Sequence, residues 1–146
     1  MQSVFSSERR VEFCETDAAG IAHFSSLIIY MEQAEHALLR SLGLSVARSH
    51  TTLHTGAEST PNFSWPRVKV ECEFLSPAKF EDVISLQTSV AILGSTSVTY
   101  QHRLSISGTL IAFGKMTSVC CYRENGSLSS VEISSQVRDL LLPYLP

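Results

Sequence analysis

The sequence lacks the features that would place the protein in a membrane or on a nucleic acid. No stretch approaches the ~18 consecutive apolar residues that a membrane-spanning helix needs, and the opening residues MQSVFSSERR contain no apolar core of a signal peptide. The formal net charge is −3 at pH 7, and the most basic local cluster is only Arg9-Arg10. A nucleic-acid binder needs a concentrated basic surface to release counterions, which argues against that class. We therefore predict a cytoplasmic protein that binds neither membranes nor nucleic acids.

Several common catalytic and cofactor motifs are also missing. The sequence has no G-x-S-x-G nucleophile elbow, and no P-loop or G-x-G-x-x-G that would cradle a nucleotide cofactor. The four cysteines have no C-x-x-C spacing, which argues against a zinc ribbon or a redox pair, and we interpret all of them as reduced thiols. His50 and His54 have the spacing of two metal ligands on one helical face, but no third ligand is evident. We expect neither a cofactor nor a metal.

One segment of the chain has the apolar pattern of a buried helix. Residues 27–42 place apolar side chains at helical spacing, and further apolar residues extend this stripe around most of the circumference. Ser25 or Ser26 can cap the start of the helix. Gly43 can adopt the left-handed conformation that ends a helix, with Leu44 packing back. These features predict a central helix of about 16 residues, ~24 Å long.

Most of the remaining sequence alternates between apolar and polar residues, as strands do. One strand is predicted before the helix, at 9–14, and Asn125-Gly126 and residues 134–142 predict a tight turn and a short final helix. The connections between the later strands are short, which implies antiparallel neighbours. Four long strands follow a polar stretch at 45–66, and they are predicted at 68–74, 84–92, 98–106 and 110–122.

The order of a strand, a long buried helix and four antiparallel strands indicates an α+β protein with the hotdog fold. In this fold one long antiparallel sheet curls around a single helix, so residues 1–146 are expected to form one domain. The pattern alone leaves a ferredoxin-like or cystatin-like α+β domain open. The strand at 68–75 is long, regular and free of proline, so as an exposed sheet edge it would tend to pair with another chain. We therefore predict a two-fold homodimer that associates further into a tetramer.

The segment ETDAAGIAHFSS at 15–26, between the first strand and the helix, carries more polar groups than a connector needs. Asp17 can bond nearby backbone amides in a turn, or it can act as a reactive carboxylate beside the free N–H groups of a helix N-terminus. The second arrangement suits acyl transfer, because the helix N-terminus can hold a developing oxyanion. Gly20 is either a turn residue or a place where the backbone approaches a ligand. His23 either bonds a carbonyl group, or polarises a substrate carbonyl or orients water.

The sequence contains a pattern of five segments: E-T-D-A-A-G-I at 15–21, Y-x-E-x-A at 30–34, L-G at 42–43, E-F at 73–74 and the segment 77–82. In this pattern it resembles the 4-hydroxybenzoyl-CoA thioesterase family of hotdog proteins, and the similarity spans most of the chain. The resemblance implies the hotdog fold and the hydrolysis of an acyl-CoA thioester without a metal. It also implies a dimer, or a tetramer of dimers, in which the active site lies between two chains.

Carried over residue by residue, the resemblance makes Asp17 the catalytic carboxylate, acting as nucleophile or general base. The backbone N–H of Phe24 becomes the oxyanion donor, and Gly20 shapes the approach to the thioester. His23 is a further catalytic candidate, and Ser25, at the helix start, is a further substrate-binding candidate. The cations available to bind CoA are Arg67, Lys69, Arg103 and Lys115, and the sequence does not rank them.

Two other functions remain open at this point. A hotdog hydratase uses an Asp and a His around the central helix, and Asp17 and His23 could supply both. The D-x-N-P-x-H motif of such hydratases is not matched, because the spacing here is one residue longer and Asn-Pro is absent. An acyl-binding protein without turnover is the third possibility. Glu35 stands where many relatives have arginine, so the reaction class carries over better than the acyl group.

Overall fold

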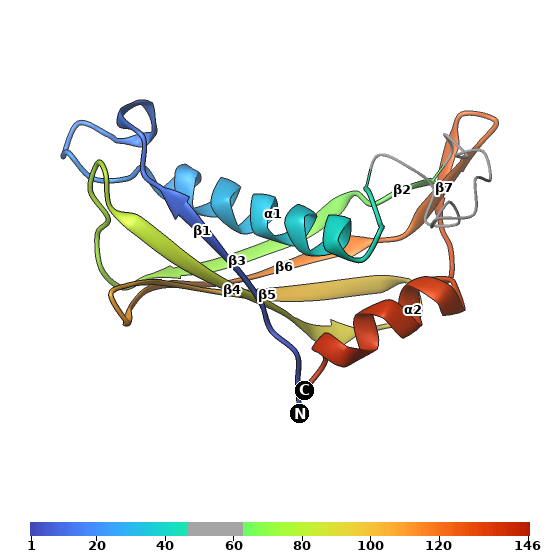
Figure 1. Cartoon of the computed structure of the whole chain (residues 1–146). Helices are drawn as coiled ribbons and strands as arrows, with labels where there is room; N and C mark the ends of the chain where they lie inside the picture. Colours follow the sequence, from blue (N-terminus) through green and yellow to red (C-terminus); the bar gives the residue numbers. More distant parts are fainter. Residues whose placement is uncertain (47–62) are drawn as a thin grey trace.

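The computed structural model describes residues 1–46 and 63–146 (Figure 1). In these residues a five-stranded sheet has the strand order β1-β4-β5-β6-β3, a three-stranded sheet has the order β2-β7-β8, and all pairs are antiparallel. The helices are α1 (Phe24–Ser41) and α2 (Ser135–Leu141), with 3₁₀ turns at Phe13–Glu15 and Leu142–Tyr144. The strands are β1 (Phe5–Arg10), β2 (Phe63–Ser64), β3 (Arg67–Phe74), β4 (Val83–Leu93), β5 (Ser97–Ile106), β6 (Thr109–Val119), β7 (Cys121–Glu124) and β8 (Ser127–Ser130).

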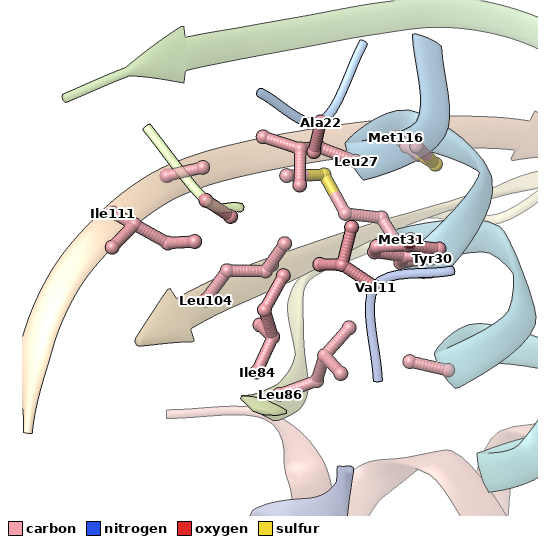
Figure 2. Close-up of a cluster of buried hydrophobic side chains, with 13 residues drawn as sticks. Val11, Ala22, Leu27, Tyr30, Met31, Ile84, Leu86, Leu104, Ile111 and Met116 are labelled. Carbon is pink, nitrogen blue, oxygen red and sulfur yellow. The ribbon is translucent and has the colours of Figure 1, made fainter. Parts of the chain in front are cut away.

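Helix α1 lies along one face of the five-stranded sheet (Figure 1). The first half of the helix packs into a continuous apolar cluster between helix and sheet, in which Tyr30 and Met31 are fully buried (Figure 2). Each buried apolar side chain of this size contributes roughly 1.5–3 kcal/mol to folding. The cluster therefore anchors the N-terminal end of α1 on the sheet. Its strand residues include Ile84, Leu86, Leu104, Ile111 and Met116.

Gly114 in β6 allows α1 to approach the sheet closely. A Cβ at this position would lie 2.4 Å from the sulfur of Met31 and 3.2 Å from the backbone oxygen of Glu71. Both distances are tighter than ordinary packing, so a larger residue would displace either the buried Met31 side chain or the neighbouring strand. The spacing between helix and sheet thus depends on the absence of a side chain at residue 114.

The predicted hotdog architecture is confirmed, with one long buried helix on an antiparallel sheet. The strands predicted at 68–74, 84–92 and 98–106 are β3, β4 and β5, and β3 is an edge strand of the five-stranded sheet, as expected. The predicted tight turn at Asn125-Gly126 joins β7 to β8, and both of its residues have positive φ, at 49° and 77°.

The helix also ends as predicted. Gly43 has a φ of 75°, in the left-handed region. The Leu44 N–H donates to the Leu39 carbonyl at 2.8 Å, and the Gly43 N–H donates to the Arg40 carbonyl at 3.0 Å. These are the two hydrogen bonds of a Schellman motif, and they satisfy carbonyl groups that the helix leaves without an internal partner.

Two predicted strand boundaries are wrong. The first strand occupies Phe5–Arg10 rather than 9–14, because the Glu15 N–H donates to the Glu12 carbonyl (3.0 Å) and closes a 3₁₀ turn where alternation suggested a strand. The strand predicted at 110–122 ends at Val119. Cys120 is fully buried and its N–H donates to the Thr96 carbonyl (2.7 Å), so the chain passes there from the five-stranded sheet to the three-stranded one.

The predicted start of the helix is also wrong. Helix α1 begins at Phe24 rather than at residue 27, and its cap is His23 instead of Ser25 or Ser26. The predicted polar stretch at 45–66 lies largely outside the described residues.

Candidate active site

The loop between the first 3₁₀ turn and α1 is closed by its own backbone. Thr16 and Ala22 form an antiparallel bridge. Inside it, the Asp17 N–H donates to the Ile21 carbonyl at 2.8 Å and the Gly20 N–H donates to the Asp17 carbonyl at 3.0 Å. Gly20 has a φ of 78°, which L-residues rarely adopt, so its role in the turn is established by the backbone. The loop therefore presents Asp17 in one defined orientation.

The Asp17 side chain takes the turn role that its sequence position suggested. Its Oδ1 accepts a hydrogen bond from the Ala19 N–H at 2.8 Å, as in an Asx turn. Within residues 1–46 and 63–146 no hydrogen bond to Oδ2 is found, and Asp17 lines a surface pocket. One carboxylate oxygen thus orients the side chain, and the other can meet a substrate.

This pocket has a volume of about 420 Å³ and lies between the start of α1 and the segment that joins β3 to β4. It brings Asp17, His23 and Phe24 together, whereas Gly20 and Ser25 lie beside it and do not line it. The pocket wall is mostly apolar, with Asp17 and His23 as its titratable groups, so it suits an acyl group that must meet a carboxylate. The remaining lining residues are Ile21, Ala22, Leu27, Phe74, Leu75, Ser76, Pro77 and Ala78.

His23 forms the N-cap of α1. Its Nδ1 accepts from the Ser25 N–H at 3.2 Å and lies 2.7 Å from the Ser25 hydroxyl. Because Nδ1 acts as an acceptor, the neutral ring carries its proton on Nε2. The ring also lies against Phe24, with the ring centroids 4.6 Å apart and the planes tilted by 34°. His23 can therefore offer a proton donor to the pocket while Ser25 is engaged with the cap.

Phe24, which the family resemblance implies as the oxyanion donor, is the first residue of α1. The first N–H groups of a helix have no internal partner and carry partial positive charge. The Ser25 and Ser26 N–H groups are used locally, because both donate to His23, to its ring nitrogen and its carbonyl. In the described part of the chain no hydrogen-bond partner is found for the Phe24 N–H, so this donor is free to bind a substrate oxygen.

A hydrogen-bond network behind the loop was not foreseen from the sequence. Glu15 joins Arg9 of β1 and Tyr30 of α1, and its backbone oxygen accepts from the His23 N–H at 2.9 Å. Glu15 and Tyr30 both belong to the segments that carry the family resemblance, but nothing in a linear pattern shows that their side chains meet.

A second charged group is buried further along α1. Glu35 is paired with Arg67 at 2.7 Å, and Arg67 also donates to the Ser118 hydroxyl at 2.9 Å. Burial raises the pKa of Glu35 to about 7, although the positive charge of Arg67 and its hydrogen bond act in the opposite direction. Arg67 is thus engaged with Glu35 and Ser118. Lys69 pairs with Glu71 at 2.6 Å on the exposed edge.

The described residues contain no metal-binding cluster and no helix suited to span a membrane. Among the described residues, no three His, Cys, Asp or Glu side chains are grouped so that they could hold a metal ion. His50 and His54 lie outside those residues. Of the described helices, none is both long and apolar enough to cross a membrane.

The sequence and the structure are both similar to known thioesterases. The family model of the thioesterase superfamily matches residues 19–112. A 1,4-dihydroxy-2-naphthoyl-CoA hydrolase from Synechococcus sp. is 28% identical, over 84% of this chain and 80% of that protein. The acyl-CoA thioester hydrolase YbgC from Escherichia coli is 24% identical, over 76% of this chain and 77% of that protein.

Similarity of fold extends to a solved enzyme–substrate complex. A variant of 4-hydroxybenzoyl-CoA thioesterase, complexed with 4-hydroxybenzoyl-CoA, superimposes with a TM-score of 0.79 at 19% identity, and covers 94% of this chain and 98% of that one. This similarity shows that the chain has the hotdog fold. The chain belongs to the thioesterase superfamily and is a thioester hydrolase, as the family resemblance predicted.

Proposed function

We propose that the protein hydrolyses acyl-CoA thioesters in the pocket beside Asp17, and that it releases the free acid and coenzyme A. The observation that carries the proposal is that Asp17 and the first residue of a buried helix line one apolar pocket, and that Asp17 Oδ2 has no hydrogen bond within the described residues. Membership of the thioesterase superfamily supports the reaction class. The relatives named for hydrolysis of acyl-CoA and naphthoyl-CoA support a CoA thioester as the substrate.

The proposed reaction uses both sides of the pocket. The thioester carbonyl oxygen accepts a hydrogen bond from the Phe24 N–H at the positive end of the helix dipole, which stabilises the negative charge that develops there. Asp17 either attacks the carbonyl carbon, forming an anhydride that water then opens, or takes a proton from an attacking water molecule. By either route the C–S bond breaks, coenzyme A leaves as a thiolate that is then protonated, and the acid remains. His23, through Nε2–H, can polarise the carbonyl or orient the water.

Replacement of Asp17 by asparagine tests the carboxylate directly. A positioned base contributes ~10²–10⁴ in rate, so Asp17→Asn should lower kcat by at least ~100-fold while the fold persists. Asp139→Asn is the matched control, because it makes the same chemical change on an exposed position of α2. Circular dichroism would verify that both variants are folded. A folded Asp17→Asn protein with normal kcat would remove Asp17 from the mechanism.

The meeting of Asp17 and His23 in one pocket is also what a hydratase would need, so this activity is the second candidate. A panel of acyl-CoA and enoyl-CoA thioesters separates the functions. Thiol release indicates the thioesterase, loss of the enoyl absorbance without thiol indicates the hydratase, and binding without either change indicates an acyl-binding protein. We expect thiol release, and the panel would also identify the acyl group.

We also propose that the active unit is a two-fold homodimer that associates into a tetramer. Strand β3 is at the edge of its sheet, and Val68 and Val70 on it are 60% and 43% exposed. Phe74 and Leu75, at the end of this strand, are also exposed and form one wall of the pocket. A second copy paired along β3 would cover these side chains and complete the pocket, and such an interface is self-complementary. A single domain over 1–146 and a cytoplasmic location remain predictions.

A further inference from the structure

The Glu15 carboxylate joins three segments behind the loop that carries Asp17. Oε1 accepts from an Arg9 Nη at 2.8 Å, while Oε2 accepts from the Glu12 N–H at 2.8 Å and from the Tyr30 hydroxyl. The Arg9 guanidinium also lies over the Tyr30 ring, 5.1 Å from its centre. Strand β1, the 3₁₀ turn and helix α1 therefore meet at one side chain.

The backbone of Glu15 holds the start of the helix. Its carbonyl oxygen accepts from the His23 N–H at 2.9 Å and from the Ser26 hydroxyl at 2.9 Å. Because His23 caps α1, this one residue fixes both the point where the loop departs and the point where the helix begins. Asp17 stands two residues after Glu15, inside the loop that these bonds close.

The charges in this network favour a rigid arrangement. Burial alone would raise the pKa of Glu15, but hydrogen bonds from Tyr30, from the Glu12 N–H and from Arg9 together lower it. Burial and the Glu15 carboxylate raise the pKa of Tyr30. At neutral pH the carboxylate is therefore ionised and the phenol is a neutral donor. Hydrogen bonds to an ionised acceptor are roughly twice as strong as neutral ones.

Arg9 and Tyr30 are themselves held in place. Tyr30 is 1% exposed and packs in the apolar cluster with Val11 and Met31 (Figure 2). The Arg9 Nε is buried and has no hydrogen-bond partner in the described part of the chain. The guanidinium thus depends on Glu15 and on the face of the Tyr30 ring for its position, and neither partner can move without disturbing the other two.

We propose that Glu15 is a positioning residue which, through Tyr30 and Arg9, sets the distance between the Asp17 carboxylate and the N-terminus of α1. The Glu15 side chain does not line the pocket, so it acts through these partners rather than on the substrate. The catalytic consequence rests on the proposed function. Misplacement of reacting groups by about 1 Å can cost ~100-fold in rate, so loss of the network should reduce kcat more than it changes KM.

The test uses Glu15→Gln, Tyr30→Phe and the double variant, with Glu8→Gln as the matched control. Glu8 lies on the same strand as Arg9, is exposed, and is outside the network. Each single substitution should lower kcat by ~10–100-fold and leave KM nearly unchanged, and Glu8→Gln should do neither. Because the two substitutions remove one shared contact, the double variant should be no slower than the slower single variant.

Hydrogen exchange provides a readout that does not depend on activity. The His23 amide, which donates to the Glu15 carbonyl, should exchange faster in Glu15→Gln than in the Glu8→Gln control. Normal kcat in folded Glu15→Gln, strictly multiplicative effects in the double variant, or unchanged exchange at His23 would each overturn the proposal. If Glu15→Gln fails to fold, Tyr30→Phe, which removes only a hydroxyl, carries the same measurements.

Failure of the proposed function would look different. In that case the wild-type protein would release no thiol from any acyl-CoA, or Asp17→Asn would keep its normal kcat. The exchange rate of the His23 amide would still support or overturn the positioning role of Glu15, since it reports the loop and the helix start directly.

Discussion

Replacing Arg67 by methionine should destabilise the protein in a pH-dependent way, because Arg67 is the counter-charge of a buried carboxylate. Glu35 is 1% exposed and its Oε2 accepts from the Arg67 Nη1 at 2.7 Å. Burial raises the pKa of Glu35 from its ordinary value of 4.5 to about 7, against the lowering effect of Arg67. When Arg67 is removed, burial acts unopposed and the pKa of Glu35 rises further.

The expected loss of stability follows from the burial of the Glu35–Arg67 pair. Removal of one partner would cost roughly 3–5 kcal/mol in the free energy of unfolding if the remaining charge stayed ionised, and protonation of Glu35 reduces this cost. Above its ordinary pKa, the Glu35 carboxyl keeps a proton in the folded state that it loses in the unfolded state, so stability falls as the pH rises towards the folded pKa. In the variant this interval extends to higher pH. Wild type loses the Glu35 proton above pH ~7, whereas the variant keeps it, and each pH unit in that interval is worth about 1.4 kcal/mol. The loss of stability in Arg67→Met should therefore be larger near pH 8 than near pH 5, by roughly 1 kcal/mol.

Urea unfolding at several pH values between 5 and 8 would measure this difference. The protein concentration must be constant, because self-association would otherwise contribute to the measured stability. The double variant Glu35→Gln/Arg67→Met has no carboxylate at this position, so its own stability should lack the fall with rising pH that Glu35 causes in wild type. A loss in Arg67→Met that is equal at pH 5 and pH 8 would refute the argument, because it would mean that the charge of Glu35 contributes nothing.

Three further predictions concern packing, metals and assembly. Gly114→Ala should lower the free energy of unfolding by roughly 1–3 kcal/mol, since its Cβ would lie 2.4 Å from the Met31 sulfur, and a urea curve unchanged from wild type would contradict the close approach of α1. EDTA should leave the thioesterase activity unchanged, whereas a loss that zinc restores would point to a metal-bound water. Sedimentation over a wide dilution range, with activity measured in parallel, should show activity falling as the dimer dissociates, and a fully active monomer would contradict the shared site.

The architecture could be predicted because each helix and strand buries one face, and the spacing of its apolar residues indicates which face is buried. The helical spacing of 27–42 and the glycine that follows it identified α1 and its end. The boundaries of a helix or strand could not be predicted where they depend on a contact outside the local pattern. The start of α1 depends on the orientation of the His23 ring, and the end of β6 depends on the backbone of Cys120 meeting Thr96.

Parts of the candidate site could also be predicted, because three of its residues are close in the chain. Asp17, His23 and Phe24 lie within a short junction, so a strand-to-helix connection of any tight geometry brings them near one another. Local spacing of this kind also showed the free N–H groups of the helix start, which any helix has. The sequence by itself therefore determined that these three residues are neighbours and that the helix start has N–H groups without an internal partner.

Only the tertiary structure decided which distant side chains support that junction. Glu15 meets Tyr30 fifteen residues later, and Glu35 meets Arg67 thirty-two residues later. The second wall of the pocket comes from Phe74 and Leu75 at the end of β3. A periodic pattern specifies the face on which a side chain lies, but not the residue of another element that it contacts. That choice is made by the register of the sheet and by the depth at which α1 packs over Gly114, and both result from packing the whole core.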